Sequence, residues 1–131
     1  MKRILVIDDD PQFLAMTTLM LREGAYEVVP ADSSEKALAL LDHEGPWDLV
    51  LCDILMPEQD GIETILAIRR RDKNQKIIAM SGGGRYLHSN QVLLFSKDIG
   101  AQEALAKPFT STELFRVVQL VLEEADASAG A

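Results

Sequence analysis

Polar side chains suited to phosphate chemistry stand directly after four apolar runs of the sequence. In chain order they are Asp8, Asp9 and Asp10 after ILVI, Asp53 after LVLC, Ser81 after KIIAM, and Lys107 after ALA. Carboxylates brought together repel, by about 4 kcal/mol for a pair ~4 Å apart at an effective dielectric constant of about 20. A proton on one carboxyl group, or a divalent cation among them, relieves that repulsion. All-oxygen ligands favour a hard cation, and Mg²⁺ is the usual one where phosphate chemistry follows.

Asp53 beside a metal ion and a lysine could accept a phosphoryl group. A carboxylate can act as a covalent nucleophile, and phosphoryl transfer depends mainly on positioning and charge neutralisation. Lys107 could pair with Asp53 or with a phosphoryl group on it, and Ser81 could donate a hydrogen bond to that group. Asp10 precedes Pro11 and is interpreted as the N-cap of a helix.

Short apolar runs alternate with amphipathic stretches along the chain. The predicted strands are residues 3–8, 26–31, 48–53, 76–81 and 103–106, and the predicted helices follow Asp10, Ser33, Asp60 and Thr110, with another over residues 91–99. Consecutive apolar residues are typical of strands buried on both faces. Alternation with helices predicts an α/β fold, an open parallel sheet covered by helices on both faces. Ligands bind such sheets at the carboxyl ends of the strands, where these polar residues stand.

Composition limits the class of protein. The chain has 131 residues, 47% of them hydrophobic, which suits a single domain. Thirteen basic and 21 acidic residues give a net charge of −8, which argues against nucleic acid as a ligand. Cys52 is the only cysteine, and no apolar run is long enough for a signal peptide or a membrane span. We therefore expect a cytoplasmic domain over residues 1–124, with a disordered tail at 125–131.

Four motifs at the ends of successive predicted strands carry a family resemblance. They are Asp8-Asp9, Asp53-Ile54-Leu55-Met56-Pro57 followed by Asp60-Gly61, Ser81, and Lys107-Pro108-Phe109. On these motifs the chain resembles a response regulator receiver domain of the stand-alone, chemotaxis-regulator type, over residues 1–124. The resemblance implies two-component signal transduction rather than metabolic catalysis. It also implies a flavodoxin-like, doubly wound sheet of five parallel strands in the order 2-1-3-4-5, with five helices.

The resemblance also implies roles for particular residues. Asp53 is expected to take a phosphoryl group from a phosphohistidine on a sensor histidine kinase or a histidine phosphotransfer protein. Mg²⁺ is expected on Asp9, Asp53 and the backbone carbonyl of Leu55, with Asp8 binding it directly or through water. The donor is expected to dock on the helix that follows the first strand.

Further expectations concern the phosphoryl group after transfer. Ser81 is expected to hydrogen-bond to it and Lys107 to pair with it, with a cis Pro108 fixing the lysine loop. The protein is then expected to act by binding a partner or by passing the phosphoryl group onward.

Three departures from the family pattern affect the output. Ala104 stands where the family usually has an aromatic ring that turns inward on phosphorylation. The segment between Ser81 and Lys107 is longer than usual, with the extra part in residues 82–90, and we hypothesise that Tyr86 or its neighbouring helix replaces the missing ring. The sequence also shows no output domain after the receiver motifs, so no DNA-binding or enzymatic effector is expected in this polypeptide.

Two alternatives remain open at this point. A haloacid-dehalogenase-type phosphatase also carries Asp-x-Asp after its first strand, and Asp8-Asp9-Asp10 fits that pattern with Asp8 as nucleophile. Position 12 is Gln rather than a hydroxyl residue, and no acidic pair follows a predicted strand after Lys107, which disfavours this alternative. A pseudo-receiver that is never phosphorylated is disfavoured because every expected acceptor-site residue is present.

Overall fold

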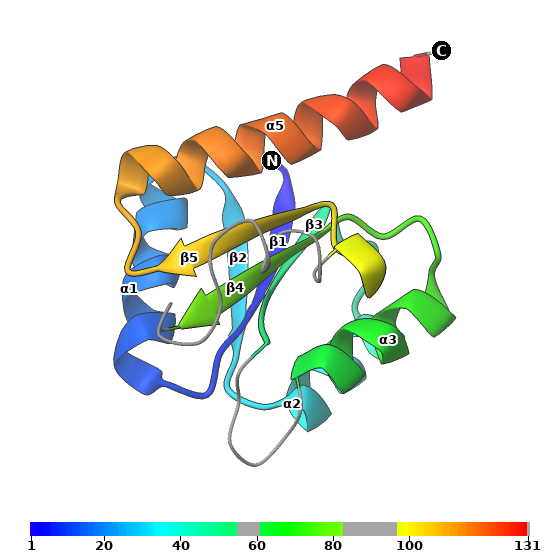
Figure 1. Ribbon diagram of the computed structural model, residues 1–131, viewed down its shortest axis with the longest axis horizontal. Coiled ribbons are helices and arrows are strands. Elements are labelled where there is room, and N and C mark those ends of the chain that lie inside the picture. Colours follow the sequence, from blue (N-terminus) through cyan, green and yellow to red (C-terminus); the bar gives the residue numbers. More distant parts are fainter. Residues whose placement is uncertain (55–60, 83–96, 131) are drawn as a thin grey trace.

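The computed structural model describes residues 1–54, 61–82 and 97–130, the last seven of them as backbone only. Strands and helices alternate along the chain (Figure 1). Their bounds are β1 Arg3–Ile7, α1 Pro11–Glu23, β2 Glu27–Ala31, α2 Ser34–His43, β3 Leu49–Asp53, α3 Gly61–Arg71, β4 Ile77–Gly82, β5 Glu103–Lys107 and α5 Ser111–Gly130.

The five strands form one parallel sheet in the order β2-β1-β3-β4-β5, which confirms the predicted topology. Strand β2, which contains Pro30, lies at an edge, where a residue without a backbone N–H is tolerated. The chain moves outward from β1 in one direction to β2 and in the other to β3. The ends of β1 and β3 therefore flank the point at which ligands bind in sheets of this kind.

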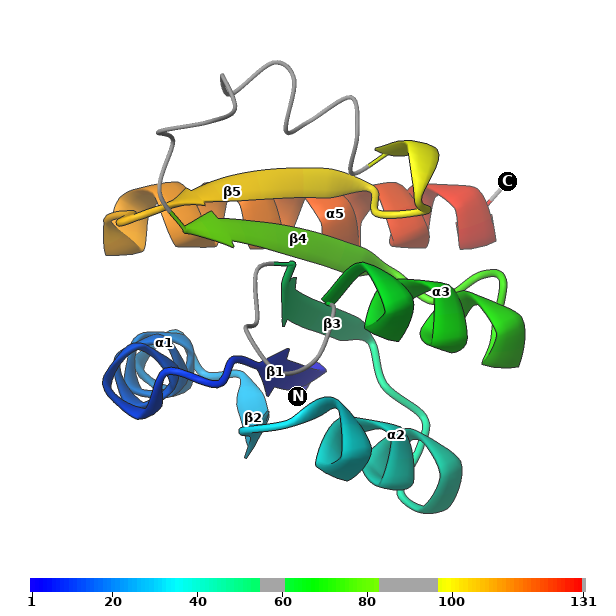
Figure 2. The same ribbon diagram turned by 60° about the horizontal axis from the view of Figure 1, so that its bottom comes forward.

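Side chains alternate between two cores along each strand. Ile4 and Val6 of β1 pack in the core with α1 and α5, whereas Leu5 and Ile7 pack in the core with α2 and α3. Figure 2 shows α1 and α5 on one side of the sheet and α2 and α3 on the other. Burial on both faces explains why the strands read as continuous apolar runs rather than as alternating ones.

Helix ends follow the predicted signals. The side chains of Asp10, Ser33 and Thr110 accept backbone hydrogen bonds at the starts of α1, α2 and α5. Gly24 follows the last residue of α1. Within the described part of the chain, no helix has the length and hydropathy needed to cross a membrane.

The described helices differ from the expected ones in two places. The described residues contain four labelled helices rather than five, because the predicted helix at 91–99 falls mostly outside them, with only residues 97 and 98 seen as helical. Helix α5 extends to Gly130, although the sequence predicts a disordered tail from residue 125. The alanines at every second position of that segment favour helix, so it can continue the preceding helix without a core of its own. The domain boundary at residue 124 stays a prediction.

Candidate functional site

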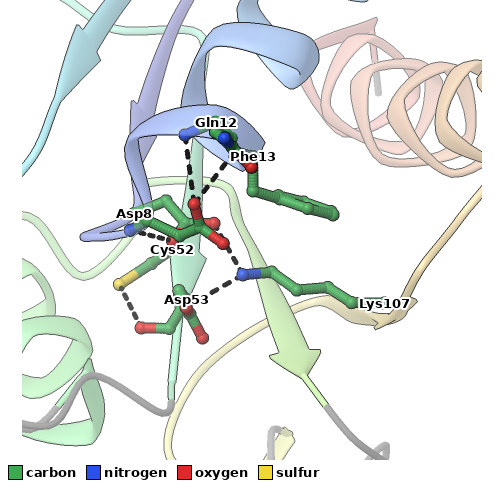
Figure 3. A network of polar contacts seen from close by, with 7 residues as sticks. Asp8, Gln12, Phe13, Cys52, Asp53 and Lys107 are labelled. Carbon is green, nitrogen blue, oxygen red and sulfur yellow. Dashed lines mark hydrogen bonds and ion pairs between the residues drawn. The ribbon is translucent and has the colours of Figure 1, made fainter.

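Three polar side chains meet at the carboxyl edge of the sheet. Asp8 follows β1, Asp53 ends β3 and Lys107 ends β5. The Lys107 ammonium nitrogen lies 2.6 Å from one carboxylate oxygen of Asp8 and 3.0 Å from one of Asp53 (Figure 3). Side chains alternate between the two faces along each strand, which explains why these three groups come together. Asp8 is on the same face of the sheet as Ile4 and Val6, and Asp53 and Lys107 are on that face too.

Burial makes this pairing necessary. Asp8 is fully buried and Asp53 is 3% exposed, so each needs a counter-charge or hydrogen bonds. The Lys107 side chain, 13% exposed, supplies one charge to both. Burial alone lowers the pKa of Lys107, but its hydrogen bonds to Asp8 and Asp53, together with their negative charges, outweigh burial and raise the pKa above its ordinary value.

The same edge offers oxygen ligands to a metal ion. One carboxylate oxygen each from Asp8, Asp9 and Asp53 lie within 4.8 Å of one another, and Asp9 is exposed while the other two are buried. Among the described residues, three carboxylates here face one ammonium group, so a divalent cation would balance the charge. Oxygen ligands of this kind fit Mg²⁺, with water completing its shell on the exposed side. The predicted fourth ligand, the carbonyl of Leu55, lies outside the described residues.

The start of α1 orients Asp8. The backbone N–H of Asp10 donates to the second carboxylate oxygen of Asp8 at 3.0 Å. The carboxylate of Asp10 accepts from the N–H groups of Gln12 and Phe13 at 3.0 and 3.3 Å. Asp10 therefore caps the helix, as predicted, while its own N–H holds Asp8.

Ser81 and the Lys107 loop lie at the same edge. Ser81 is buried near the end of β4 and pairs in register with Ala106, the neighbour of Lys107. The Lys107–Pro108 peptide bond is cis. Ala104, at the position of the expected aromatic ring, is half-buried and pairs with Ala79. Tyr86, the hypothetical replacement, lies outside the described residues.

Sequence reasoning missed the parts that Gly61 and Phe13 play in this arrangement. A Cβ atom on Gly61 would lie 2.5 Å from the Cα of Ile54 and 2.9 Å from the carbonyl carbon of Asp53, so α3 begins directly against the backbone of Asp53. The motif Asp60-Gly61 stands in the sequence, but it is equally typical of an ordinary helix start. Phe13 carries its ring beneath the Lys107 ammonium group, whereas its helical spacing predicts only a core residue.

Residues 4–119 match the family described as the response regulator receiver domain. The chain is 32% identical over 122 residues to the transcriptional regulatory protein CpxR of Escherichia coli K12, covering 93% of this chain and 50% of that protein. It thus spans about half the length of such curated relatives. A 14.6 kDa protein of Leptolyngbya boryana is 36% identical over 118 residues, covering 88% of this chain and 86% of that one.

Solved structures of other proteins superpose on this fold. The CheY-like receiver domain protein of Methanospirillum hungatei JF-1 superposes with a TM-score of 0.86 at 29% identity, covering 98% of each chain. The response regulator TrrA of Thermotoga maritima, solved in complex with Mg(2+)-BeF, gives a TM-score of 0.78 at 36% identity, covering 92% of this chain and 99% of that one.

Proposed function

Because the chain belongs to the response regulator receiver family of two-component signal transduction, we propose that Asp53 is its phosphoryl acceptor. The observation that carries the proposal is the bridge from Lys107 to Asp8 and Asp53, at 2.6 and 3.0 Å, beside the exposed Asp9. It combines a nucleophile, a fixed positive charge and oxygen ligands for a metal within one edge of the sheet.

Transfer to Asp53 is a displacement at phosphorus. A carboxylate oxygen of Asp53 forms the new P–O bond while the bond from phosphorus to the donor's imidazole nitrogen breaks, and its electron pair leaves with the imidazole. Lys107 stays beside the carboxylate and neutralises part of the charge on the phosphoryl oxygens. Ser81, near the end of the adjacent strand β4, donates a hydrogen bond from its hydroxyl group to an oxygen of the phosphoryl group.

Mg²⁺ is the proposed cofactor, held by Asp8, Asp9, Asp53 and the backbone carbonyl of Leu55. When bound, it supplies further positive charge to the phosphoryl oxygens. The acidic cluster supports this assignment through its oxygen donors and its excess of negative charge. The complex of the related TrrA protein with Mg(2+)-BeF supports it independently.

A sensor histidine kinase or a histidine phosphotransfer protein is the proposed donor, docking on α1. The capped start of this helix holds Asp8, so a partner on α1 lies next to the acceptor site. Its outer side carries apolar surface, with Leu19 60% exposed. A hollow of about 460 Å³ between α1 and the end of β2 includes Ala15, Leu19 and Pro30 in its lining. An apolar helix face on the donor would bury this surface.

Partner binding or onward phosphorelay is the proposed output. Ala104 carries only a methyl group where the family usually has a ring that turns inward. The change caused by phosphorylation must therefore be transmitted through other residues. This departure favours relay of the phosphoryl group over the usual aromatic switch.

The test is the intact mass of the protein after incubation with acetyl phosphate. Wild type is expected to gain one phosphoryl group with Mg²⁺ and none with an excess of chelator. Lys107→Ala is expected to slow the gain by at least about tenfold, the scale of losing one charge-stabilising group. Lys73→Ala, which removes an exposed lysine at the far end of the sheet, is the matched control and should behave as wild type. A gain that ignores the chelator, or an equal effect of both lysine variants, contradicts the proposal.

A further inference from the structure

Resting on the proposed function, we propose that Phe13 is a positioning residue that holds the Lys107 ammonium group against Asp8 and Asp53. The centre of the Phe13 ring lies 4.2 Å from the ammonium nitrogen, which sits over the ring. A cation over an aromatic face is attracted by the negative charge of the π system. Lysine has a flexible four-carbon stem, so a charge that must stay at one point needs such support.

The ring completes the surroundings of the ammonium group. Two of its three N–H donors are directed to Asp8 and Asp53, at 2.6 and 3.0 Å. The ring attracts the cation from a further side without offering an oxygen that competes with the two carboxylates (Figure 3). An aliphatic side chain of similar size would fill the same space but would lack this attraction.

Contacts around Phe13 form a closed circuit that starts and ends at Asp8. The N–H of Asp10 holds one oxygen of Asp8 at 3.0 Å, and the Asp10 carboxylate accepts from the N–H of Phe13 at 3.3 Å. The Phe13 ring then holds Lys107, which returns to the other oxygen of Asp8 at 2.6 Å. Each of these four residues is therefore held by two of the others. The first turn of α1 is in this way linked to the Lys107 ammonium group.

A second aromatic residue fixes the orientation of the ring. Phe109, two residues after Lys107 and 6% exposed, meets Phe13 edge to face, with ring centres 5.2 Å apart and planes at 89°. Such pairs contribute stability beyond the area that they bury. Phe109 thus links the Lys107 loop to α1 independently of the ammonium group.

The test compares Phe13→Leu, which removes the π face, with Phe13→Tyr, which keeps it. Phe115→Leu is the matched control, because Phe115 is also half-buried and packs against the same core cluster. The first readout is the NMR shift of the Lys107 side-chain methylene protons in the protein without metal. The second is the rate of phosphorylation by acetyl phosphate with Mg²⁺, and circular dichroism checks that each variant is folded.

We expect the Lys107 methylene protons to be shifted upfield by the ring in wild type and Phe13→Tyr, and the shift to vanish in Phe13→Leu. The phosphorylation rate is expected to fall by about two- to tenfold in Phe13→Leu, the range of a partly exposed cation–π contact. Phe13→Tyr should restore it, and Phe115→Leu should leave it unchanged.

Several outcomes would overturn the proposal. They are the absence of a ring shift on Lys107 in wild type, equal rates in wild type and Phe13→Leu, and an equal loss in Phe115→Leu or Phe13→Tyr. If wild type shows the ring shift but accepts no phosphoryl group, the proposed function fails while the placement of Lys107 by Phe13 stands.

Discussion

Replacing Gly61 with alanine tests how the start of α3 is built against the acceptor residue. Helix propensity alone predicts that Gly61→Ala stabilises the protein, since alanine is better than glycine in a helix by up to about 1 kcal/mol. The structure predicts the opposite sign. The new Cβ atom would lie 2.5 Å from the Cα of Ile54 and 2.9 Å from the carbonyl carbon of Asp53, both in rigid backbone.

The size of the effect follows from these distances. Ordinary contact begins near 3.4 Å and the carbonyl oxygen of Asp53 is closer still to the new Cβ atom, so α3 and the end of β3 must separate by at least about 1 Å. Overpacking of this kind typically costs about 1–3 kcal/mol, sometimes more. Because the contacts are with backbone and far below contact distance, the upper end of that range applies, and after subtraction of a propensity gain of up to about 1 kcal/mol we expect Gly61→Ala to lower the free energy of unfolding by about 2 kcal/mol. Because the carbonyl of Asp53 is itself displaced, phosphorylation should slow as well.

The assay is urea unfolding followed by the fluorescence of Trp47, the only tryptophan, which is buried beside α2. Gly82→Ala is the matched control, because a Cβ atom there makes its nearest contact at 3.4 Å, with the flexible side chain of Lys107. That variant should stay within about 1 kcal/mol of wild type. A Gly61→Ala protein as stable as wild type, or more stable, would refute the reasoning.

Three further predictions concern residues that take no part in the transfer itself. Thr17 is fully buried and its hydroxyl has no hydrogen-bond partner among the described residues, so Thr17→Val should raise the free energy of unfolding by about 1 kcal/mol, whereas Thr17→Ser should lower it. Burial, reinforced by nearby negative charges, raises the pKa of the Cys52 thiol, so a thiol reagent at pH 8 should react only after urea unfolds the chain; rapid reaction of the native protein would contradict this. Ala25 has φ 67°, so Ala25→Gly should stabilise the fold by about 0.5–1 kcal/mol in thermal unfolding, while Ala39→Gly, in an exposed turn of α2, should destabilise it by about as much.

The layout of the site could be predicted from sequence because two features determine it: where each strand ends, and which face of the sheet each side chain is on. Asp8, Asp53 and Lys107 each stand at the end of an apolar run, and parallel strands bring such ends to one edge. Local signals sufficed for the cap at Asp10, since an Asp-Pro pair before an amphipathic stretch has few other structural meanings.

What could not be predicted depends on contacts between distant segments. The sequence suggested that Lys107 pairs with Asp53, but its bridge to Asp8 as well depends on how far the Lys107 side chain reaches past β4 and β3 toward the end of β1. The spacing of Phe13 along α1 is that of a core residue, and only the packed structure reveals a cation over its ring. Gly61 likewise shows its role only through the backbone that it approaches.

The central claim, that Asp53 rather than Asp8 accepts the phosphoryl group, is tested most directly by locating the modified residue. Wild type, Asp53→Asn and Asp8→Asn would be treated with acetyl phosphate and Mg²⁺, reduced with borohydride to trap the aspartyl phosphate, and mapped by peptide mass spectrometry. We predict modification at Asp53 in wild type and none in Asp53→Asn. In Asp8→Asn we predict that the modified residue is again Asp53 and that the reaction is slower than in wild type. Modification at Asp8, or a phosphoryl group that persists in Asp53→Asn, would contradict the account.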